Sequence, residues 1–519
     1  MPIITYGGGG GKDTKIAYLP YQTGSLTYSG LTQYPSWAGY DPNKLTIGGV
    51  TSSINAGTFT ATFTPVSGFS WWDGSTSAKS ATWTMGKAAL PAVTLEPTEI
   101  ELTSKTLPET VTVTRKGNGA ISATISPAIA TISVSGNVIS VQGDGTSGTA
   151  TLTVNVAEGD NYLAASNAGT VTVTTAYGGV YGVQWDGTST TVLSRTDDAA
   201  GFSNPVPYIS GASNYGSPFD DIMPWSGMVR STDSEAGELV SIPKFWYRLS
   251  QNGVNLKIQI SNTEADGFSV SPAHMNRGDG AGERDVVYVG RYHCASTYKS
   301  ATGVKPQASI TRATARSNIH NRGSNIWQMD FATRFTIWLL YIVEYANWNS
   351  QTTIGYGCGN NSSTANMGYT DSMPYHTGTT LSSRTTYGLG TQYRYIEGLW
   401  DNVLDWLDGC YNASSGLNLI LNPANFSDSS GGTSVGTPSS GYPSALTLND
   451  TVFPMWRPSA ANGSDSTYVP DDWYFDTSSP VVGCGGYYSQ SLNCGMFYLG
   501  RYSVSDSYGD IGCRLIKLP

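Results

Sequence analysis

The order of hydrophobic and polar residues along the first part of the chain predicts β-strands. Residues 57–63 alternate between apolar and polar side chains, as a strand with one buried face does. Residues 69–72 and 81–85 form two further candidate strands around the turn signal Asp73-Gly74. We therefore expect a first β-sandwich over residues 15–88.

A stricter alternation of Val or Ile with Thr or Ser follows a linker at residues 86–91. It occurs in residues 111–114, 132–134, 138–141, 149–156 and 170–174. Short strands at this spacing, separated by turn residues, are typical of an antiparallel sandwich. The pattern predicts a second sandwich over residues 91–176.

The pattern changes near residue 177, where Trp, Tyr, Arg and His become more frequent. Residues 331–346 carry apolar side chains at helical spacing, and Asp330 is placed to cap the N-terminus of that helix. Residues 396–407 predict a second, shorter helix or a turn. Residues 177–519 thus form an expected α+β domain, with Trp327, Trp338, Trp400 and Trp406 in its core.

Composition narrows the functional classes. A chain of 519 residues suggests three or four domains. The formal net charge is -10 and no basic run occurs, which argues against a nucleic-acid partner. No stretch of 18 uncharged apolar residues is present, so we expect no membrane insertion.

The chain begins with a Gly-rich leader over residues 1–14, which we interpret as a flexible segment or attachment arm. It lacks the charged and apolar regions of a signal peptide. If this is the native start, the chain is not exported by the usual route.

The six cysteines all lie after residue 293 and include no CxxC pair. Their spacing suits neither a zinc site nor a dense disulfide framework. Scattered reduced thiols are the simplest interpretation, and one or two disulfides remain an alternative.

Three segments of the last domain carry a family resemblance. Residues 398–409, Gly-Leu-Trp-Asp-Asn-Val-Leu-Asp-Trp-Leu-Asp-Gly, are similar to the GNVWEWVDG segment of formylglycine-generating-enzyme-like domains, a branch of the C-type lectin fold. Residues 511–515 are similar to the closing GFRLV strand of that family. Residues 485–499 resemble the variable cassette of diversity-generating-retroelement target proteins, which include phage tropism determinants.

The resemblance, together with residues 120–160 that resemble bacterial Ig-like repeats, implies a fold class. It is mostly β, with two Ig-like β-sandwiches followed by a C-type-lectin-like fold over residues 177–519. The variable C-terminal region is expected at about residues 465–519. Family members are often trimers, so a homo-oligomer is expected.

The tail from residue 465 to residue 510 is rich in Tyr, Ser, Asn, Asp and Gly, which is the composition of antibody paratopes. A surface loop without function is the alternative. The predicted ligand-binding face consists of Asp472, Trp473, Tyr474, Tyr487, Tyr488, Ser489, Ser491, Asn493, Arg501, Tyr502, Ser503, Ser505, Ser507, Tyr508 and Asp510.

The resemblance also implies how such a face changes. Family members replace adenines of a template, so an Asn codon can become Tyr, Ser, Asp, Gly, Cys or Arg. Interleaved framework residues are expected to stay fixed. They are Gly495, Phe497, Leu499, Gly512, Arg514 and Leu515.

Candidate chemistry elsewhere is sparse. Formylglycine-generating enzymes bind copper through two closely spaced cysteines, whereas Cys484 and Cys494 here are ten positions apart. A structural calcium ion is an option at Asp401, Asp405 and Asp408, although Asp405 and Asp408 are better explained by backbone or Arg partners.

Two other motifs have simpler interpretations. The four histidines, at positions 274, 293, 320 and 376, have no metal-binding spacing and are interpreted as structural. The tripeptide at residues 277–279, Arg-Gly-Asp, is interpreted as a polar turn. We expect no catalytic residues and no enzyme activity.

The sequence therefore predicts a phage tail protein that determines tropism by binding a host cell-surface protein or glycan. Its other expected partners are virion tail proteins, and its expected location is the virion, extracellular after release. One alternative is a bacterial surface adhesin of fixed specificity. Another is a copper oxidase of the formylglycine-generating type.

Overall fold

The computed structural model describes residues 14–102, 107–144, 146, 148–175, 178–358 and 361–519. The chain divides into two compact units, Met1–Tyr177 and Gly178–Pro519. Of the predicted leader, residues 1–13 lie outside the described residues, as do residues 176–177 at the expected domain border. The described chain is mostly β, with many small sheets and few helices.

The first half of the N-terminal unit folds around buried aromatic side chains. Its strands are β1 (Lys15–Ile16), β2 (Tyr21–Thr23), β3 (Leu26–Thr27), β4 (Ser36–Ala38), β5 (Leu45–Gly49), β6 (Gly57–Pro65), β7 (Ser70–Trp71) and β8 (Lys79–Gly86). The main sheet has the order β3-β8-β6-β5. Phe63 and Trp83 point from β6 and β8 into a core that also holds Trp71, so the alternation predicts the buried face.

The second half is a sandwich of two sheets. Its strands are β9 (Thr94–Glu96), β10 (Glu99–Leu102), β11 (Glu109–Thr114), β12 (Ile121–Ser126), β13 (Ala130–Ser135), β14 (Val138–Gly143), β15 (Gly148–Val156) and β16 (Ala165–Thr175). The sheet orders are β10-β16-β15-β12 and β13-β14-β11-β9. Val111, Val141 and Val173 are fully buried in its core. The predicted strands of this segment are confirmed.

The C-terminal unit contains several small sheets around a larger core. Its strands are β17 (Val180–Trp185), β18 (Ser194–Asp197), β19 (Tyr208–Ile209), β20 (Arg230–Asp233), β21 (Gly237–Pro243), β22 (Trp246–Asn252), β23 (Asn255–Ser261), β24 (Ser269–Val270), β25 (Val286–Gly290), β26 (Ile326–Gln328), β27 (Gly378–Thr379), β28 (Thr391–Tyr393), β29 (Ile396–Glu397), β30 (Leu404–Leu407), β31 (Cys410–Ala413), β32 (Gly416–Leu419), β33 (Thr433–Ser434), β34 (Ala445–Asn449), β35 (Met455–Ala460), β36 (Val481–Cys484), β37 (Leu499–Tyr502), β38 (Ile511–Gly512) and β39 (Leu515–Lys517).

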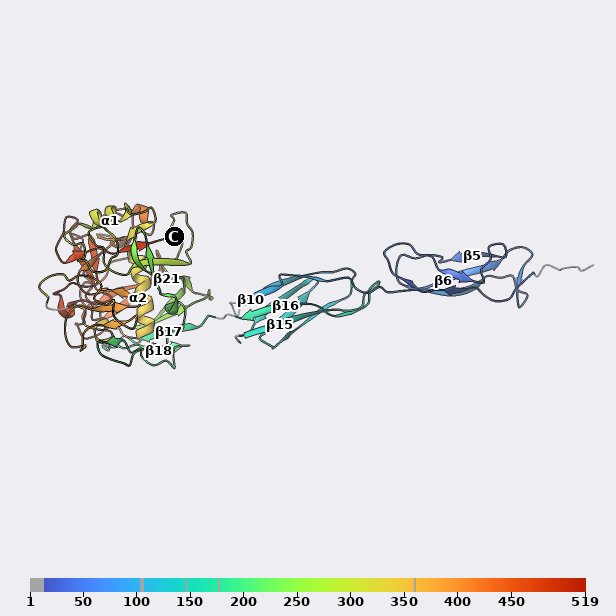
Figure 1. Cartoon of the computed structure of the whole chain (residues 1–519), viewed down its shortest axis with the longest axis horizontal. Helices are drawn as coiled ribbons and strands as arrows, with labels where there is room; N and C mark the ends of the chain where they lie inside the picture. The colour runs from blue at the N-terminus through green and yellow to red at the C-terminus, as the bar shows by residue number, and fades with distance from the viewer. Residues whose placement is uncertain (1–13, 103–106, 145, 147, 176–177, 359–360) are drawn as a thin grey trace, which may run out of the picture. The chain divides into compact units, whose positions relative to one another are not determined.

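Helix α2 (Phe331–Tyr345) is the centre of this core. The shorter helices are α1 (Arg312–His320), α3 (Ser350–Thr353) and the 3₁₀ turns η1 (Trp225–Gly227), η2 (Pro423–Asn425) and η3 (Ser491–Asn493). Asp330 caps α2 by accepting a hydrogen bond from the backbone N–H of Thr333, as predicted. Every residue of α2 is buried, and the helix packs against β17 and β23 (Figure 1). A helix buried on all sides is expected to be mostly apolar. Its two charged residues, Arg334 and Glu344, have buried partners in the Leu399 carbonyl and Arg394.

The prediction of a second helix or turn over residues 396–407 is wrong as to the helix. This segment forms β29 and β30, joined by a tight turn in which Asn402 has a φ of 66°. The Trp and Leu side chains that suggested a helix are buried, some on β30 and others, Leu399 and Trp400, in the connection before it. Trp338, Trp400 and Trp406 are fully buried, whereas Trp327 is only partly buried and stacks on His320.

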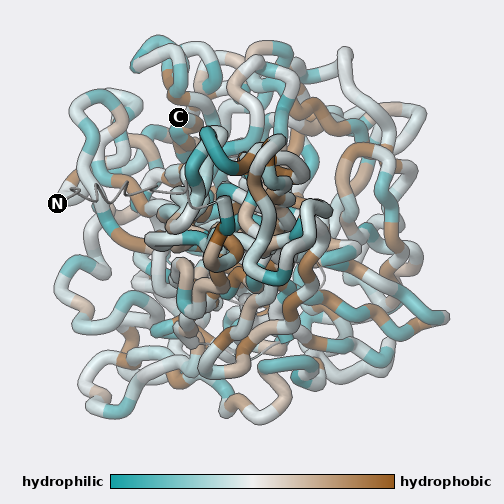
Figure 2. Tube along the Cα trace, turned by 90° about the vertical axis from the view of Figure 1, so that its right-hand side faces the viewer, coloured by the Kyte–Doolittle hydropathy of each residue, from teal (hydrophilic) through white to brown (hydrophobic). Residues whose placement is uncertain are grey.

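Hydrophobic and hydrophilic residues alternate at short intervals along much of the trace (Figure 2). Among the described residues, no helix combines the length and the apolar character that crossing a lipid bilayer requires.

Candidate ligand-binding face

The predicted face is built on the antiparallel pair β36 and β37. Val482 lies opposite Arg501 in this pair, and the sheet continues through β30 to β38. All of β36 is buried, whereas Arg501 and Tyr502 at the end of β37 reach the surface. The strand pair therefore fixes the two ends of the loop at residues 485–498.

The six predicted framework residues all lie in the interior. They are Gly495, Phe497, Leu499, Gly512, Arg514 and Leu515. A Cβ atom at position 495 would collide with the Asp471 carboxylate, and one at position 512 would lie 2.7 Å from the Gln307 carbonyl oxygen. These glycines are required by the close approach of neighbouring groups.

Arg514 holds the framework together electrostatically. It donates to Asp405 Oδ2 at 2.9 Å and also to the backbone carbonyl of Gly290. His293 Nδ1 lies 2.8 Å from the other oxygen of Asp405. Burial alone would raise the pKa of Asp405, but the adjacent guanidinium and imidazole groups hold it below its usual value. The last strand is thereby tied to the interior of the unit.

Thirteen of the fifteen predicted face residues have exposed or half-buried side chains. The half-buried residues are Tyr487, Tyr488, Ser491, Tyr502, Ser503 and Asp510; the exposed residues are Tyr474, Ser489, Asn493, Arg501, Ser505, Ser507 and Tyr508. Their surroundings are rich in hydroxyl groups and aromatic rings.

The other two predicted residues, Asp472 and Trp473, lie in the interior and present no exposed side chain. The Trp473 ring packs against Trp338 with a centroid distance of 5.6 Å. Asp472 accepts a hydrogen bond of 3.0 Å from the Tyr474 hydroxyl, and burial raises the pKa of its carboxyl group. Of these three consecutive residues, only Tyr474 has an exposed side chain.

Ring contacts link the exposed residues of the face. The Tyr474 ring lies 6.2 Å from the Tyr498 ring, and the Arg501 guanidinium lies 6.0 Å from the Tyr474 centroid. Arg501 also forms an ion pair with Asp476. The neighbouring rings of Tyr487 and Tyr488 have centroids 5.9 Å apart and are nearly perpendicular.

Tyr442 and Tyr387, which the sequence prediction did not include, also touch this face. The Tyr442 hydroxyl donates to Asn493 Oδ1 at 2.9 Å. Tyr387 is hydrogen-bonded to Ser491 and has a pKa raised mainly by burial. Both tyrosines occur in short Ser-, Thr- and Gly-rich segments, so composition could have indicated them, but their distance along the chain concealed the contact.

The loop at residues 485–498 is anchored to the interior of the unit by a disulfide and by hydrogen bonds. Cys494 forms a disulfide with Cys358, and Gln351 Nε2 donates to the Ser491 carbonyl at 3.1 Å. The Tyr488 N–H donates to the Asn402 carbonyl at 3.1 Å. Of the two alternatives for the cysteines, the structure favours one disulfide; Cys294, Cys410, Cys484 and Cys513 are buried free thiols.

This disulfide also bears on the copper alternative. A thiolate is needed to bind copper, and the sulfur of Cys494 is bonded to Cys358. Burial raises the pKa of the Cys484 thiol to about 11. Within the described part of the chain, no group of three or more His, Cys, Asp or Glu side chains is placed to hold a metal ion.

The three carboxylates considered for calcium have protein partners. Asp401 accepts hydrogen bonds from Tyr369 and from the hydroxyl of Thr391. Asp405 pairs with Arg514 as described above, and Asp408 Oδ2 accepts a hydrogen bond of 2.6 Å from Arg316 Nε.

The Arg-Gly-Asp tripeptide is only partly exposed, because its arginine lies in the interior. Arg277 is buried and forms an ion pair with Asp330, while Asp279 pairs with Arg284. All four histidines have polar partners, as the structural interpretation expects. The partners are Ser271 for His274, Asp405 for His293, the Ile326 carbonyl for His320 and Asp220 for His376.

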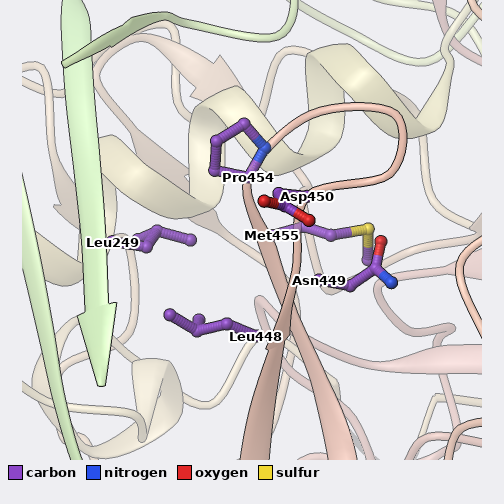
Figure 3. Close-up of a pocket in the computed structure, with 6 residues that line it drawn as sticks. All are labelled: Leu249, Leu448, Asn449, Asp450, Pro454 and Met455. Atoms are coloured by element: carbon purple, nitrogen blue, oxygen red, sulfur yellow. The ribbon is translucent and has the colours of Figure 1, made fainter. Parts of the chain in front are cut away.

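Concave sites occur along the seam between β22 and β34. One pocket of about 290 Å³ is lined by Leu249, Leu448, Asn449, Asp450, Pro454 and Met455; Figure 3 shows Leu249 and Leu448 facing its interior from the two strands. Adjacent pockets measure about 500 Å³ and 300 Å³. None of the fifteen predicted residues lines these three pockets.

Comparison with known proteins gives no family. No protein-family model matches the chain, and no curated protein matches it. Among solved structures, invasin, a bacterial integrin-binding protein, aligns at 9% identity over 79% of this chain and 96% of that one, with a TM-score of 0.22. The titin I-band fragment I67–I69 aligns at 10% identity over 53% and 91%, with a TM-score of 0.19. InvD of Yersinia pseudotuberculosis aligns at 12% identity over 51% and 89%, with a TM-score of 0.18. Scores this low carry no argument about this chain.

Proposed function

We propose that this chain is a recognition protein that binds a target on a cell surface through the Tyr- and Ser-rich face of its C-terminal unit. One observation carries the proposal. In the last 55 residues, six framework positions are buried while thirteen interleaved positions expose tyrosine, serine, asparagine, aspartate or arginine side chains.

The chemistry of these side chains suits binding. Tyrosine offers a large flat contact surface and a hydroxyl group with few rotatable bonds, so little conformational entropy is lost when it binds. Aromatic and arginine side chains dominate the binding energy of many interfaces. Tyr474, Arg501 and Tyr508 are exposed examples on this face.

A finer proposal follows from the sequence resemblance. The C-terminal unit would be a C-type-lectin-like domain with an exchangeable cassette, and the carrier would be a phage tail on which several copies strengthen weak binding. The two sandwiches would act as spacers. Burial of the motif residues Trp400, Asp405 and Trp406 supports a shared framework for that motif.

A fixed-specificity surface adhesin is the second candidate, and the disulfide between Cys358 and Cys494 is compatible with it. Disulfides persist in oxidising compartments, so this bond supports a surface or extracellular location for either carrier. We further propose that the chain is not an enzyme. The copper alternative lacks support because Cys494 is bonded to Cys358 rather than free beside Cys484.

The proposal is tested with the full chain displayed on fluorescent beads and incubated with a panel of bacterial strains. The double variant Tyr474→Ala/Tyr508→Ala removes two exposed rings of the face. We expect binding to strains recognised by the wild-type chain to fall at least about tenfold, the effect of about 1.4 kcal/mol.

The matched control is Tyr21→Ala/Tyr34→Ala, which removes two exposed tyrosines of the N-terminal unit. The control should bind like the wild-type chain. Loss of binding in the control together with full binding by the face variant would contradict the proposal.

A further inference from the structure

The last of the three pockets described above lies at the tip of the hairpin formed by β22 and β23, where the hairpin meets β34. This pocket has a volume of about 300 Å³. The residues that line it are Trp185, Gly187, Gln251, Gly253, Val254, Ser444, Ala445, Leu446, Thr447 and Ser459. It shares no residue with the Tyr- and Ser-rich face.

The lining is uncharged. It combines hydroxyl groups of serine and threonine, one side-chain amide and the apolar surfaces of Val254, Ala445 and Leu446. A charged ligand would find no counter-ion among these residues. A neutral ligand with several hydroxyl groups and an apolar face would match both parts of the lining.

Trp185 forms part of the buried wall of the pocket. Its side chain is 1% exposed, and the indole Nε1 makes no hydrogen bond to a described residue. The ring packs edge-on against Trp348 at 6.0 Å, which fixes its position. The Nε1 atom is itself inaccessible, so Trp185 contributes a buried wall of the pocket, and its indole N–H serves as a nearby reporter rather than a ligand contact.

Gln251 is held as a rigid wall of the pocket. Its Nε2 donates to the Leu446 carbonyl at 2.8 Å, and its Oε1 accepts from the Leu448 N–H at 3.3 Å. The side-chain amide thus joins β22 to the free edge of β34. One N–H of the amide remains for another acceptor, because an amide nitrogen carries two.

We propose that this pocket binds one neutral sugar residue, of the size of a hexose, through the Gln251 amide and the hydroxyl of Thr447, beside the wall that Trp185 forms. A sugar ring presents acceptor oxygens at its edge and apolar C–H groups on its face. The volume lies at the lower end of the range for ligand pockets, which suits one ring rather than a long chain. The site is additional to the face proposed above and does not depend on it.

The test uses the full chain and four probes offered singly at about 10 mM, which detects the weak affinities expected of one small ring. They are methyl α-D-glucopyranoside, methyl α-D-mannopyranoside, methyl β-D-galactopyranoside and methyl N-acetyl-β-D-glucosaminide. Saturation-transfer NMR reports binding, and the indole N–H resonance assigned through Trp185→Phe reports the site. We expect at least one probe to receive saturation and to shift that indole resonance.

Two variants decide where a probe binds. Ala445→Phe fills the pocket and should reduce the saturation-transfer signal at least about fivefold. Thr447→Val keeps the shape of a surface side chain and should weaken binding by about threefold to tenfold, the effect of one neutral hydrogen bond. Thr433→Val on β33 removes a similar hydroxyl outside the pocket and should change nothing.

Three results would overturn the proposal. One is no saturation transfer to any of the four probes, and another is a probe that binds Ala445→Phe as well as the wild-type chain. The third is binding that leaves the Trp185 indole resonance unmoved, which would place the sugar elsewhere on the molecule.

Discussion

Among single residues, Arg514 is expected to contribute strongly to stability. Its guanidinium is fully buried and neutralises Asp405, so Arg514→Met would leave a buried carboxylate with only His293 beside it. We expect the free energy of unfolding to fall by about 3–5 kcal/mol. Chemical denaturation of the variant measures this loss.

The control for that measurement is Arg230→Met, which removes an exposed guanidinium lying 5.2 Å from the Tyr395 ring. This control substitution should lower the free energy of unfolding by less than about 1 kcal/mol. Equal losses in the two variants would show that burial of the Arg514 ion pair is not what stabilises the framework.

Asp471 makes stability depend on pH in a defined direction. Its carboxyl group accepts the N–H of Phe497 at 2.8 Å, and burial raises its pKa from 3.8 to about 7. Between these values the folded protein holds a proton that the unfolded chain releases, so folding becomes less favourable as the pH rises. Asp471→Asn removes this penalty.

Thermal or chemical unfolding of the wild-type chain and of Asp471→Asn, measured at pH 4 and at pH 7, tests this effect. The variant should gain stability relative to the wild-type chain by up to about 4 kcal/mol across this range, at about 1.4 kcal/mol per pH unit. A difference between the two proteins that does not change with pH would contradict the assignment.

Among elements, removing the N-cap of α1 and removing that of α2 should lower the free energy of unfolding by different amounts. Thr311 caps α1 near the surface, so Thr311→Ala should cost about 1 kcal/mol. Asp330 caps α2 and also neutralises the buried Arg277, so Asp330→Ala should cost at least about 3 kcal/mol. Unfolding of both variants measures the difference, and equal costs would argue against a role for the ion pair.

The loop at residues 485–494 should depend on its disulfide. Replacing both cysteines in Cys358→Ala/Cys494→Ala removes the covalent link but leaves the hydrogen bonds to Ser491 and Tyr488. We expect amide exchange in residues 486–493 to speed up at least about tenfold, while α2 keeps its protection. Unchanged exchange in the loop would mean that the hydrogen bonds alone hold it.

Local patterns predicted elements well where strands alternate or where a capping residue precedes a long apolar run. The alternation over residues 132–141 marks β13 and β14, and Asp330 with the apolar run after it marks α2. Residues 396–407 misled the prediction because strands buried on both sides carry apolar residues without alternation. Periodicity cannot separate such short strands from a helix.

At the scale of the molecule, the framework was easier to predict than the face. The glycines and the closing strand could be inferred from residues near one another in sequence. The contacts of Tyr442 with Asn493 and of Cys358 with Cys494 join segments that are 51 and 136 positions apart, and one sequence contains no signal for them. Whether Trp473 points inward depends on its packing against Trp338, which is equally remote.

The central claim is that a fixed framework carries an exchangeable binding face. Deep sequencing of the codons for residues 465–519 across a natural population tests it most directly. The account predicts substitutions concentrated at exposed positions such as Tyr474, Ser489 and Tyr508, with Gly495 and Arg514 unchanged. Substitutions spread evenly over both groups, or a tail without variation, would contradict it.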